Sequence, residues 1–367
     1  MSALIVVNVF YFLRELGIVQ WYAGLTALLF AIGSPVYIYS SMLFIEPIAA
    51  LAVLYAMRVL CRPVLSRWRL VVASAGLGVL PWVHGRFTLF SVVIGGLLAW
   101  RVWRVAGRAG VWRYALGVLP VLVLVLGYEV YNVVVWHSLN PAPGNANVGN
   151  GVFQVPVYKG FLGITLDRSF GVIPNFPLFA LVLPGVLLAM RRGLNQLNAA
   201  IAVVVVPYLL VVSTFSQWYA GYSPPARYIA AVAPLLSYYV AVTLQRLHNW
   251  LVNTGAVLLA LFSASLSVIG DVLPTTRFNW PEWPQGQAMQ RLGDLLGIRF
   301  VRYVPSSFLT GQAGMFAVWA LGLAVGTAII WYIGWRQPAS RTPDWPVRLV
   351  ERRGRSGPAD AAEPATG

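Results

Sequence analysis

Long apolar runs separated by short polar connections make up most of the sequence. Two runs, 114–136 and 312–335, exceed the roughly 20 residues that a helix needs to cross a hydrocarbon layer of ~30 Å, and several others approach that length. The runs are continuously apolar, whereas the strands of a membrane barrel alternate between apolar and polar positions over about ten residues. A helix also satisfies its own backbone groups where no water is available. The pattern therefore predicts an all-α integral membrane protein.

The same pattern predicts about eleven transmembrane helices within residues 1–335. We expect two long segments, 137–176 and 271–311, to form external loops, because connections of this length are uncommon unless they act as lids or binding loops. Residues 336–367 are rich in Arg and then in Pro, Ala and Gly, which predicts a basic, disordered cytoplasmic tail attracted to anionic lipid. The predicted helices are centred on 2–13, 18–33, 43–60, 70–83, 88–103, 114–136, 177–190, 197–215, 229–247, 250–270 and 312–335.

Basic residues are divided unequally between the two ends of the predicted helices. Eighteen of the 26 Lys and Arg residues fall in segments expected on one side, and the other eight fall in the longer segments on the other side. The positive-inside rule makes the first side cytoplasmic, which predicts a multi-pass protein of the cell (plasma or inner) membrane with a cytoplasmic C-terminus. The cytoplasmic set consists of Arg14, Arg58, Arg62, Arg67, Arg69, Arg101, Arg104, Arg108, Arg113, Arg191, Arg192, Arg246, Arg336, Arg341, Arg348, Arg352, Arg353 and Arg355.

This alternation starts the first predicted helix on the external side, with only Met1 and Ser2 before it. A helix that begins outside normally follows an earlier helix that carried the chain across. The start has neither the basic region nor the cleavage site of a signal peptide. We therefore expect a further span and its first external loop upstream of this sequence, or a reading frame that starts late.

Composition supports the membrane interpretation. Of the 367 residues, 59% are hydrophobic and only 10% are charged, and the mean hydropathy is +0.71, so most of the surface must face lipid. The net charge of +15 is typical of nucleic-acid binding proteins, but the basic residues lie in short clusters between apolar runs. We expect membrane lipids rather than nucleic acid as partners. The single Cys61 has no partner for an internal disulfide, and no Cys or His cluster indicates a structural metal site.

Few ionisable residues lie within the predicted helices or at their external ends, where a charge is costly and a functional role is the default hypothesis. Glu46 precedes Pro47 at a predicted helix start. It fits either a helix-terminus acid, worth ~0.3–1 kcal/mol, or an active-site acid. The cations predicted at the same external ends of other helices favour the active-site interpretation.

Two segments would present cations at the external surface. His84, Gly85 and Arg86 form a very tight predicted turn between two helices, and a lipid phosphate is the natural anion at that depth. The alternative is a snorkelling arginine beside a polar turn histidine. Arg227 stands at a predicted helix start, where a cation is disfavoured unless it has a partner.

Three further residues are candidates for substrate contact. Glu129 lies about two turns inside the external end of its helix and fits either an arginine pair or a proton or substrate contact. Asp167 fits either a simple turn or a substrate contact, and Tyr222 lies close in sequence to Arg227. The external Trp280 fits sugar stacking or, as the more common role, the interfacial aromatic belt. The sequence has no phosphate-binding glycine loop, Ser-His-Asp set or zinc motif, so any chemistry rests on isolated acids and cations.

Taken together, four segments resemble the polytopic GT-C superfamily of membrane glycosyltransferases, which includes protein O-mannosyltransferases and lipid A aminoarabinose transferases. The stretch 12–56 looks like the second and third helices of that family, with Glu46 in the place of an acid followed by proline. The turn 83–86 falls where many members have a basic residue beside glycine. Segments 166–192 and 220–234 are similar to an L-D-R segment and an R-Y segment of bacterial members.

The resemblance implies a GT-C-like fold and inverting transfer of a hexosyl or pentosyl group from a polyprenyl-phosphate donor. The acceptor would be a lipid, glycan or protein on the external face of the membrane. Glu46 would be the second acid, and Arg86, His84 and Arg227 would bind the donor phosphate as negative charge develops on it. No cofactor is firmly implied, and a divalent metal stays open.

The principal base of the family usually sits in the first external loop, after the first helix. This sequence has no such loop, which agrees with the expected upstream segment and implies that the chain as given could be inactive. Two alternatives stay open. A lipid flippase or transporter would also need many helices and a few intramembrane charges, although transporters usually show repeated halves and helices broken at mid-membrane. The other is an inactive fragment or scaffold.

Overall fold

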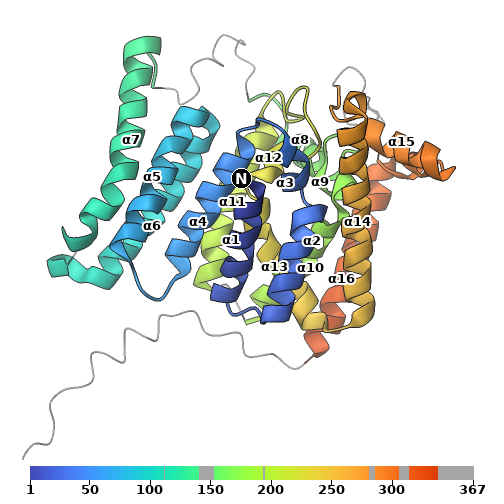
Figure 1. Ribbon diagram of the computed structural model, residues 1–367, viewed down its shortest axis with the longest axis horizontal. Helices are drawn as coiled ribbons and strands as arrows, with labels where there is room; N and C mark the ends of the chain where they lie inside the picture. The colour runs from blue at the N-terminus through green and yellow to red at the C-terminus, as the bar shows by residue number, and fades with distance from the viewer. Residues whose placement is uncertain (111, 140–152, 193–194, 281–285, 306–313, 338–367) are drawn as a thin grey trace, which may run out of the picture.

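The computed structural model describes the chain except residues 111, 140–152, 193–194, 281–285, 306–313 and 338–367 (Figure 1). The described residues form helices, with one isolated β-bridge between Ser223 and Asn279. The first half contains α1 (Ser2–Glu15), α2 (Gln20–Gly33), α3 (Pro35–Ile38), α4 (Glu46–Cys61), α5 (Arg67–Val83), α6 (Thr88–Gly110) and α7 (Trp112–Trp136). The second half contains α8 (Val157–Leu166), α9 (Val172–Asn175), α10 (Val182–Ala189), α11 (Gln196–Thr214), α12 (Arg227–Ala230), α13 (Ala233–Leu247), α14 (Trp250–Val272), α15 (Gln287–Leu296) and α16 (Gly314–Arg336).

Five of the described helices are long and apolar enough to cross a membrane, so the chain is an α-helical membrane protein. A sixth span results if α2 and the segment Pro35–Ser41, which are bent by 51° at Ser34, are counted as one. The prediction of eleven spans and of a GT-C-like fold stays a prediction. α1 has 14 residues and α4 has 16, which makes them about 21 and 24 Å long and shorter than a typical bilayer core. The five helices are Gly85–Gly107, Tyr114–Trp136, Gln196–Thr214, Trp250–Val272 and Met315–Arg336.

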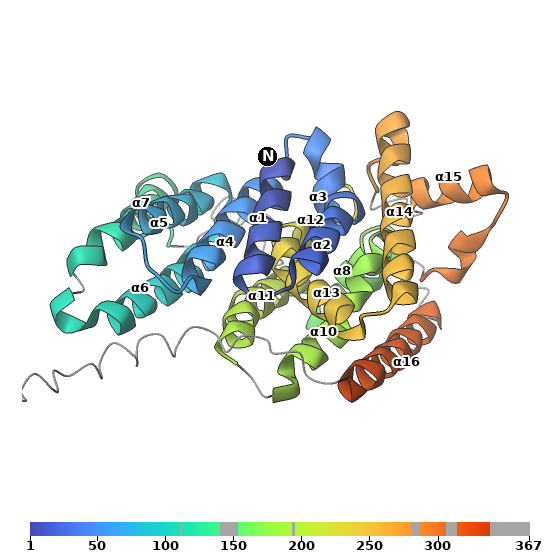
Figure 2. The same cartoon turned by 60° about the horizontal axis from the view of Figure 1, so that its bottom comes forward.

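The helices form a bundle with a buried centre and two apolar flanks. α5, α6 and α7 lie on one side, α14 and α16 lie on the other, and α1, α4, α11 and α13 lie between them (Figure 2). α13 is buried on almost every side, with only Leu236 and Gln245 partly exposed, so it lies in the centre of the bundle. The outward faces of α7 and α16 carry exposed large apolar side chains, which suits contact with lipid.

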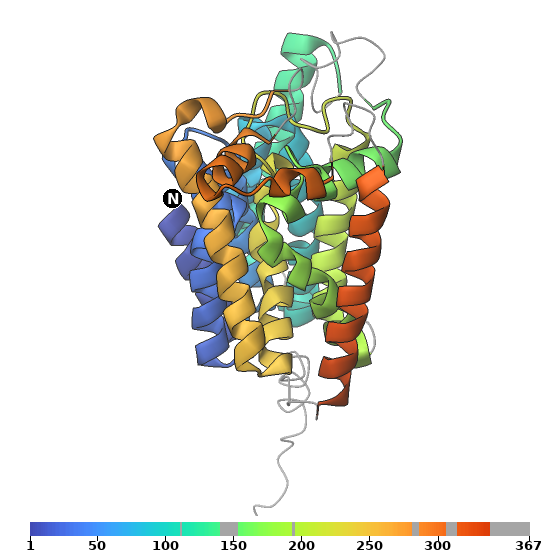
Figure 3. The ribbon, with the colours of Figure 1, turned by 90° about the vertical axis from the view of Figure 1, so that its right-hand side faces the viewer.

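The two ends of the bundle differ. Short connections that contain many of the arginines lie at one end, and the long connections lie at the other (Figure 3). α15 packs against α14 at that end and points away from the bundle (Figure 1). The predicted external loops contain helices: α8 and α9 lie within 137–176, and α15 lies within 271–311. The predicted tail, 336–367, lies almost wholly outside the described residues.

Close backbone contact joins α10 to α13 in the centre of the bundle. A Cβ atom added to Gly185 would lie 2.0 Å from the carbonyl oxygen of Tyr239, so only glycine allows the two helices to approach this closely. Thr243 adds a hydrogen bond from its Oγ1 to the Leu181 carbonyl, at 2.8 Å. This contact places α13 and the short α12 before it in a defined position.

Replacing Gly185 with alanine should destabilise the protein by about 1–3 kcal/mol or more, because the helices must separate to admit the methyl group. Thermal unfolding of the purified protein in detergent would measure the loss. Gly255→Ala on α14 is the matched control: nothing lies within 4 Å of the added Cβ, and alanine is the better helix former by about 1 kcal/mol. Equal melting temperatures for the two variants would contradict the packing argument.

Candidate functional site

Glu46, the first residue of α4, lies at the centre of a cluster of charges. Its side chain is fully buried, and its Oε1 accepts hydrogen bonds from both Arg86 and Arg227. The Nε atom of Arg227 lies 2.8 Å from this oxygen. Two guanidinium groups on one carboxylate give the cluster a formal net charge of +1. The sequence named these three residues separately, and the structure brings them together.

The turn between α5 and α6 positions Arg86. The Nδ1 atom of His84 accepts a hydrogen bond from the Arg86 backbone N–H at 3.3 Å and caps the short 3-10 helix Gly85–Phe87. Burial, together with the nearby guanidinium groups, lowers the pKa of His84 to about 4. His84 is therefore neutral near pH 7. It orients the turn and does not add a third cation.

A strained segment positions Arg227 at the start of α12. Ala220 and Ala226 adopt left-handed backbone conformations, with φ of 67° and 57°, which cost about 1 kcal/mol or more for each non-glycine residue. Two hydrogen bonds hold the segment: Arg227 Nη1 donates to the Ala220 carbonyl at 3.1 Å, and the Ala226 N–H donates to the Phe170 carbonyl at 2.9 Å. The result is a fixed guanidinium directed at Glu46.

Aromatic rings surround the two arginines. The guanidinium of Arg86 lies 4.8 Å from the Phe87 ring centroid and 4.9 Å from that of Tyr228, and Arg227 lies 4.8 Å from the ring of Phe44. These cation–π contacts stabilise charge where little water is available. The sequence interpretation missed Phe44 and Tyr228, because aromatic residues at a helix end cannot be told from an interfacial belt without contacts.

Two polar atoms in the cluster lack a protein partner. Within the described part of the chain, Glu46 Oε2 and Arg86 Nε are buried and make no hydrogen bond. Such atoms are rare in native structures and call for an explanation. A ligand oxygen could accept from Arg86 Nε while a ligand hydroxyl donates to Glu46 Oε2. Together with the net positive charge, this arrangement fits an anion that also carries a hydroxyl group.

Two other predicted residues make their described contacts elsewhere, and a third lies on α7. The Oδ1 of buried Asp167 accepts from the N–H groups of Ser169 and Phe170, at 2.8 and 3.1 Å, which is a turn contact. Tyr222 is exposed and makes an edge contact with Trp280, with ring centroids 5.2 Å apart. Glu129 lies on α7, and its buried Oε2 has no hydrogen-bond partner among the described residues.

Over the described residues, no group of three or more His, Cys, Asp or Glu side chains is placed to hold a metal ion. Comparison with known protein families, with characterised proteins and with solved structures gave no match. The described helices and the ion pairs define the class of protein: an α-helical membrane protein with a buried, positively charged cluster at one end of its bundle.

Proposed function

We propose that the protein transfers a hexosyl or pentosyl group from a polyprenyl-phosphate donor to a lipid, glycan or protein acceptor at the membrane surface. The observation that supports the proposal is the convergence of Arg86 and Arg227, from segments far apart in sequence, on buried Glu46. These residues lie at an end of the helices, where lipid headgroups are found. The resemblance to GT-C glycosyltransferases points to the same residues.

In this proposal the two arginines hold the donor phosphate. Arg86 Nε donates to a phosphate oxygen, and the polyprenyl chain extends along the apolar outer surface of the helices. Glu46 prevents the two guanidinium groups from repelling each other and keeps them aimed at one point. Because both guanidinium groups donate to its Oε1, the role of the carboxylate in this proposal is to position the arginines.

The sugar is then transferred in one displacement at its anomeric carbon, during which negative charge develops on the departing phosphate. The acceptor oxygen forms a bond to the anomeric carbon from the face opposite the phosphate, which inverts that carbon. The bond from the anomeric carbon to the phosphate oxygen breaks, and its electron pair leaves with the phosphate, where the preorganised arginines stabilise the new charge. The acceptor proton passes to a base outside this cluster, and the phosphate leaves without protonation.

The test is binding of decaprenyl phosphate to the protein in lipid nanodiscs, followed by assay of sugar transfer from its mannosyl ester. Arg86→Ala should weaken binding about ten-fold to a hundred-fold, the value of one charge-assisted hydrogen bond, and should abolish transfer. Arg291→Ala is the control, because Arg291 is an exposed cation of α15 at the same end of the bundle.

Unchanged binding in Arg86→Ala would refute the phosphate-binding role. Movement of the lipid between leaflets by the wild-type protein, without any glycosyl transfer, would instead support a flippase. Loss of binding in both variants would mean that general surface charge, rather than the cluster, attracts the lipid.

A further inference from the structure

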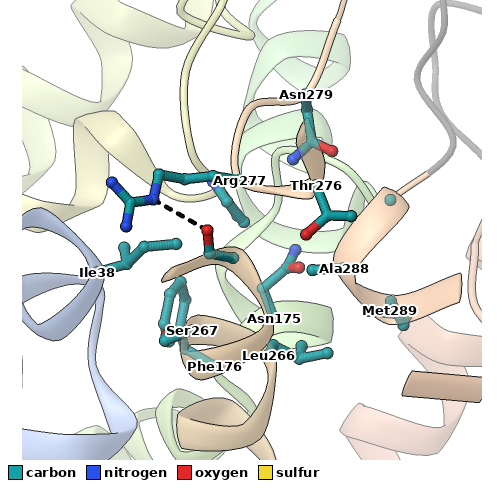
Figure 4. A pocket seen from close by; sticks show the side chains of 13 residues that line it. Ile38, Asn175, Phe176, Leu266, Ser267, Thr276, Arg277, Asn279, Ala288 and Met289 are labelled. Carbon is teal, nitrogen blue, oxygen red and sulfur yellow. Dashed lines mark hydrogen bonds between the residues drawn. The ribbon is translucent and has the colours of Figure 1, made fainter. Parts of the chain in front are cut away.

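α15 is amphipathic, and its apolar side continues past the edge of the bundle. Met289, Leu292 and Leu296 are spaced by three and four residues, so they lie on one side of the helix. Met289 forms a buried cluster with Val304 and with Leu266 of α14, beside the small cavity drawn in Figure 4. α15 has ten residues and is about 15 Å long, and its far end points away from the bundle (Figure 1). Its apolar side is therefore covered near the start of the helix and uncovered at Leu296.

The turn that ends α15 leaves a further apolar residue uncovered. Gly297 has a left-handed backbone with φ of 68°, and the Ile298 N–H donates to the Gly293 carbonyl at 2.9 Å, which is a Schellman motif. In this motif the residue after the left-handed one commonly packs against the side chain five positions earlier. That position is Gly293, so Ile298 has no side chain to pack on. An exposed apolar tip results, formed by Leu295, Leu296 and Ile298, which are 64%, 58% and 55% exposed.

The segment that follows the apolar tip packs against two membrane-spanning helices. The ring centroids of Phe300 and Phe262 are 6.0 Å apart, and Phe262 lies ten residues before the end of α14. Trp319, in the second turn of α16, donates from its Nε1 to the Tyr303 carbonyl at 2.7 Å. Ile298 is only two residues from Phe300, so their Cα atoms are no more than about 7.6 Å apart. The apolar tip therefore lies near the level at which α14 and α16 leave the hydrocarbon layer.

Two exposed arginines follow the apolar tip. Arg299 and Arg302 take part in none of the ion pairs formed between the described residues. The guanidinium of Arg302 lies 5.0 Å from the ring centroid of Tyr303, which is also exposed. Arginine and tyrosine beside apolar side chains are typical of the headgroup level of a membrane, where the arginine can extend its charge to a phosphate. The charge of this segment complements that of anionic lipid.

We infer that the apolar tip, with Arg299 and Arg302, is an interfacial anchor that inserts into the lipid leaflet at this end of the bundle and prefers anionic phospholipids. The three apolar side chains enter the boundary between headgroups and acyl chains, as the apolar side of an interfacial helix does. The two arginines bind the phosphate groups of the surrounding lipids. The anchor shares no residue with the charged cluster, so it does not depend on the proposed sugar transfer.

Fluorescence quenching of the full chain in lipid nanodiscs tests the insertion. A bimane label on Leu296→Cys is compared with the same label on Asp294→Cys, which is exposed on the opposite side of α15 because two residues turn a helix by about 200°. The native Cys61 is buried and should not react. Lipids with nitroxides at two depths should place the Leu296 label about 5–10 Å into the boundary between headgroups and acyl chains. Aqueous iodide should quench only the Asp294 label.

Two outcomes would overturn the insertion. Equal quenching of both labels by iodide would show that the apolar tip faces water. Protection of the Leu296 label from both iodide and the nitroxide lipids would show that protein covers the tip, either a second copy of this chain or another partner.

The preference for anionic lipid is measured with the same Leu296 label. Nitroxide phosphatidylglycerol should quench it more strongly than nitroxide phosphatidylcholine at equal mole fraction, with a local enrichment of about five-fold for each arginine, or about 1 kcal/mol. Replacing both Arg299 and Arg302 with alanine should make the two lipids quench equally. The control is a label on Val134→Cys, an exposed position of α7 on the opposite flank, where the two lipids should quench equally. Equal quenching with both arginines present, or a preference that survives their removal, would overturn this part of the inference.

Discussion

Glu46→Ala is expected to destabilise the folded protein by about 3–5 kcal/mol, the usual effect of removing one partner from a buried ion pair. The loss is large because Glu46 is fully buried and balances two guanidinium groups whose side chains are only 12% and 23% exposed. Without the carboxylate, Arg86 and Arg227 repel each other where little water can screen them. Thermal unfolding in detergent would measure the change.

A double variant can show whether Glu46→Ala loses stability through the broken ion pairs or through the cavity that the shorter side chain leaves. Adding Arg86→Ala to Glu46→Ala should cost less than the sum of the two single changes, because the second change removes a charge that the first left unpaired. Decaprenyl phosphate should raise the melting temperature of Glu46→Ala, since an anion can replace the carboxylate. Asp294→Ala, at an exposed acid of α15, is the control. Strict additivity of the double variant would contradict the coupling.

Glu15→Ala should also destabilise the protein, by about 1–3 kcal/mol, because it breaks an ion cluster at the opposite end of the bundle. Arg58 donates to Glu15 through Nη2 at 2.7 Å and Nε at 3.2 Å, and Arg62 donates through Nη2 at 2.6 Å. These contacts join the end of α1 to the end of α4. The expected loss is smaller than at Glu46 because Glu15 is 19% exposed and Arg62 20%, so the freed Arg62 can reach water.

Chemical denaturation monitored by tryptophan fluorescence would measure this loss. Glu15→Gln separates charge from shape, because the amide keeps the volume but leaves Arg58 without a carboxylate in its mostly buried position. It should lose nearly as much stability as the alanine variant. A Glu15→Gln protein as stable as the wild type would show that packing of the side chain, rather than its charge, joins the two helices.

The helices that could be predicted from the sequence are those with continuous apolar runs. Segments such as 114–136 and 250–270 match α7 and α14 closely, because their length and hydropathy leave few alternatives in a membrane. α9 and α12 are four residues long and depend on tertiary contacts, so local pattern gives no signal for them. The sequence predicts a loop at α15 because its ten residues mix apolar, polar and charged side chains and are too few to cross a membrane.

The charged cluster could be predicted as a set of isolated residues, but its geometry could not. Glu46, Arg86 and Arg227 stand out because charges are rare in apolar segments. Their pairing depends on the folded arrangement of three segments, and a single sequence does not give those distances. The sequence interpretation also missed the ion pair between Asp271, in the last turn of α14, and Arg277. Both residues lie at or just after a helix end, where charged residues are ordinary.

The strained segment from Ala220 to Arg227 has a consequence for how the charged cluster would respond to a ligand. The left-handed backbone at alanines 220 and 226 is held by tertiary contacts, among them the hydrogen bond from Arg227 Nη1 to the Ala220 carbonyl. A ligand that competes with that carbonyl for Arg227 would therefore also loosen the segment. Linkage is mutual, so whatever orders the segment changes the affinity of the cluster for that ligand by the same factor.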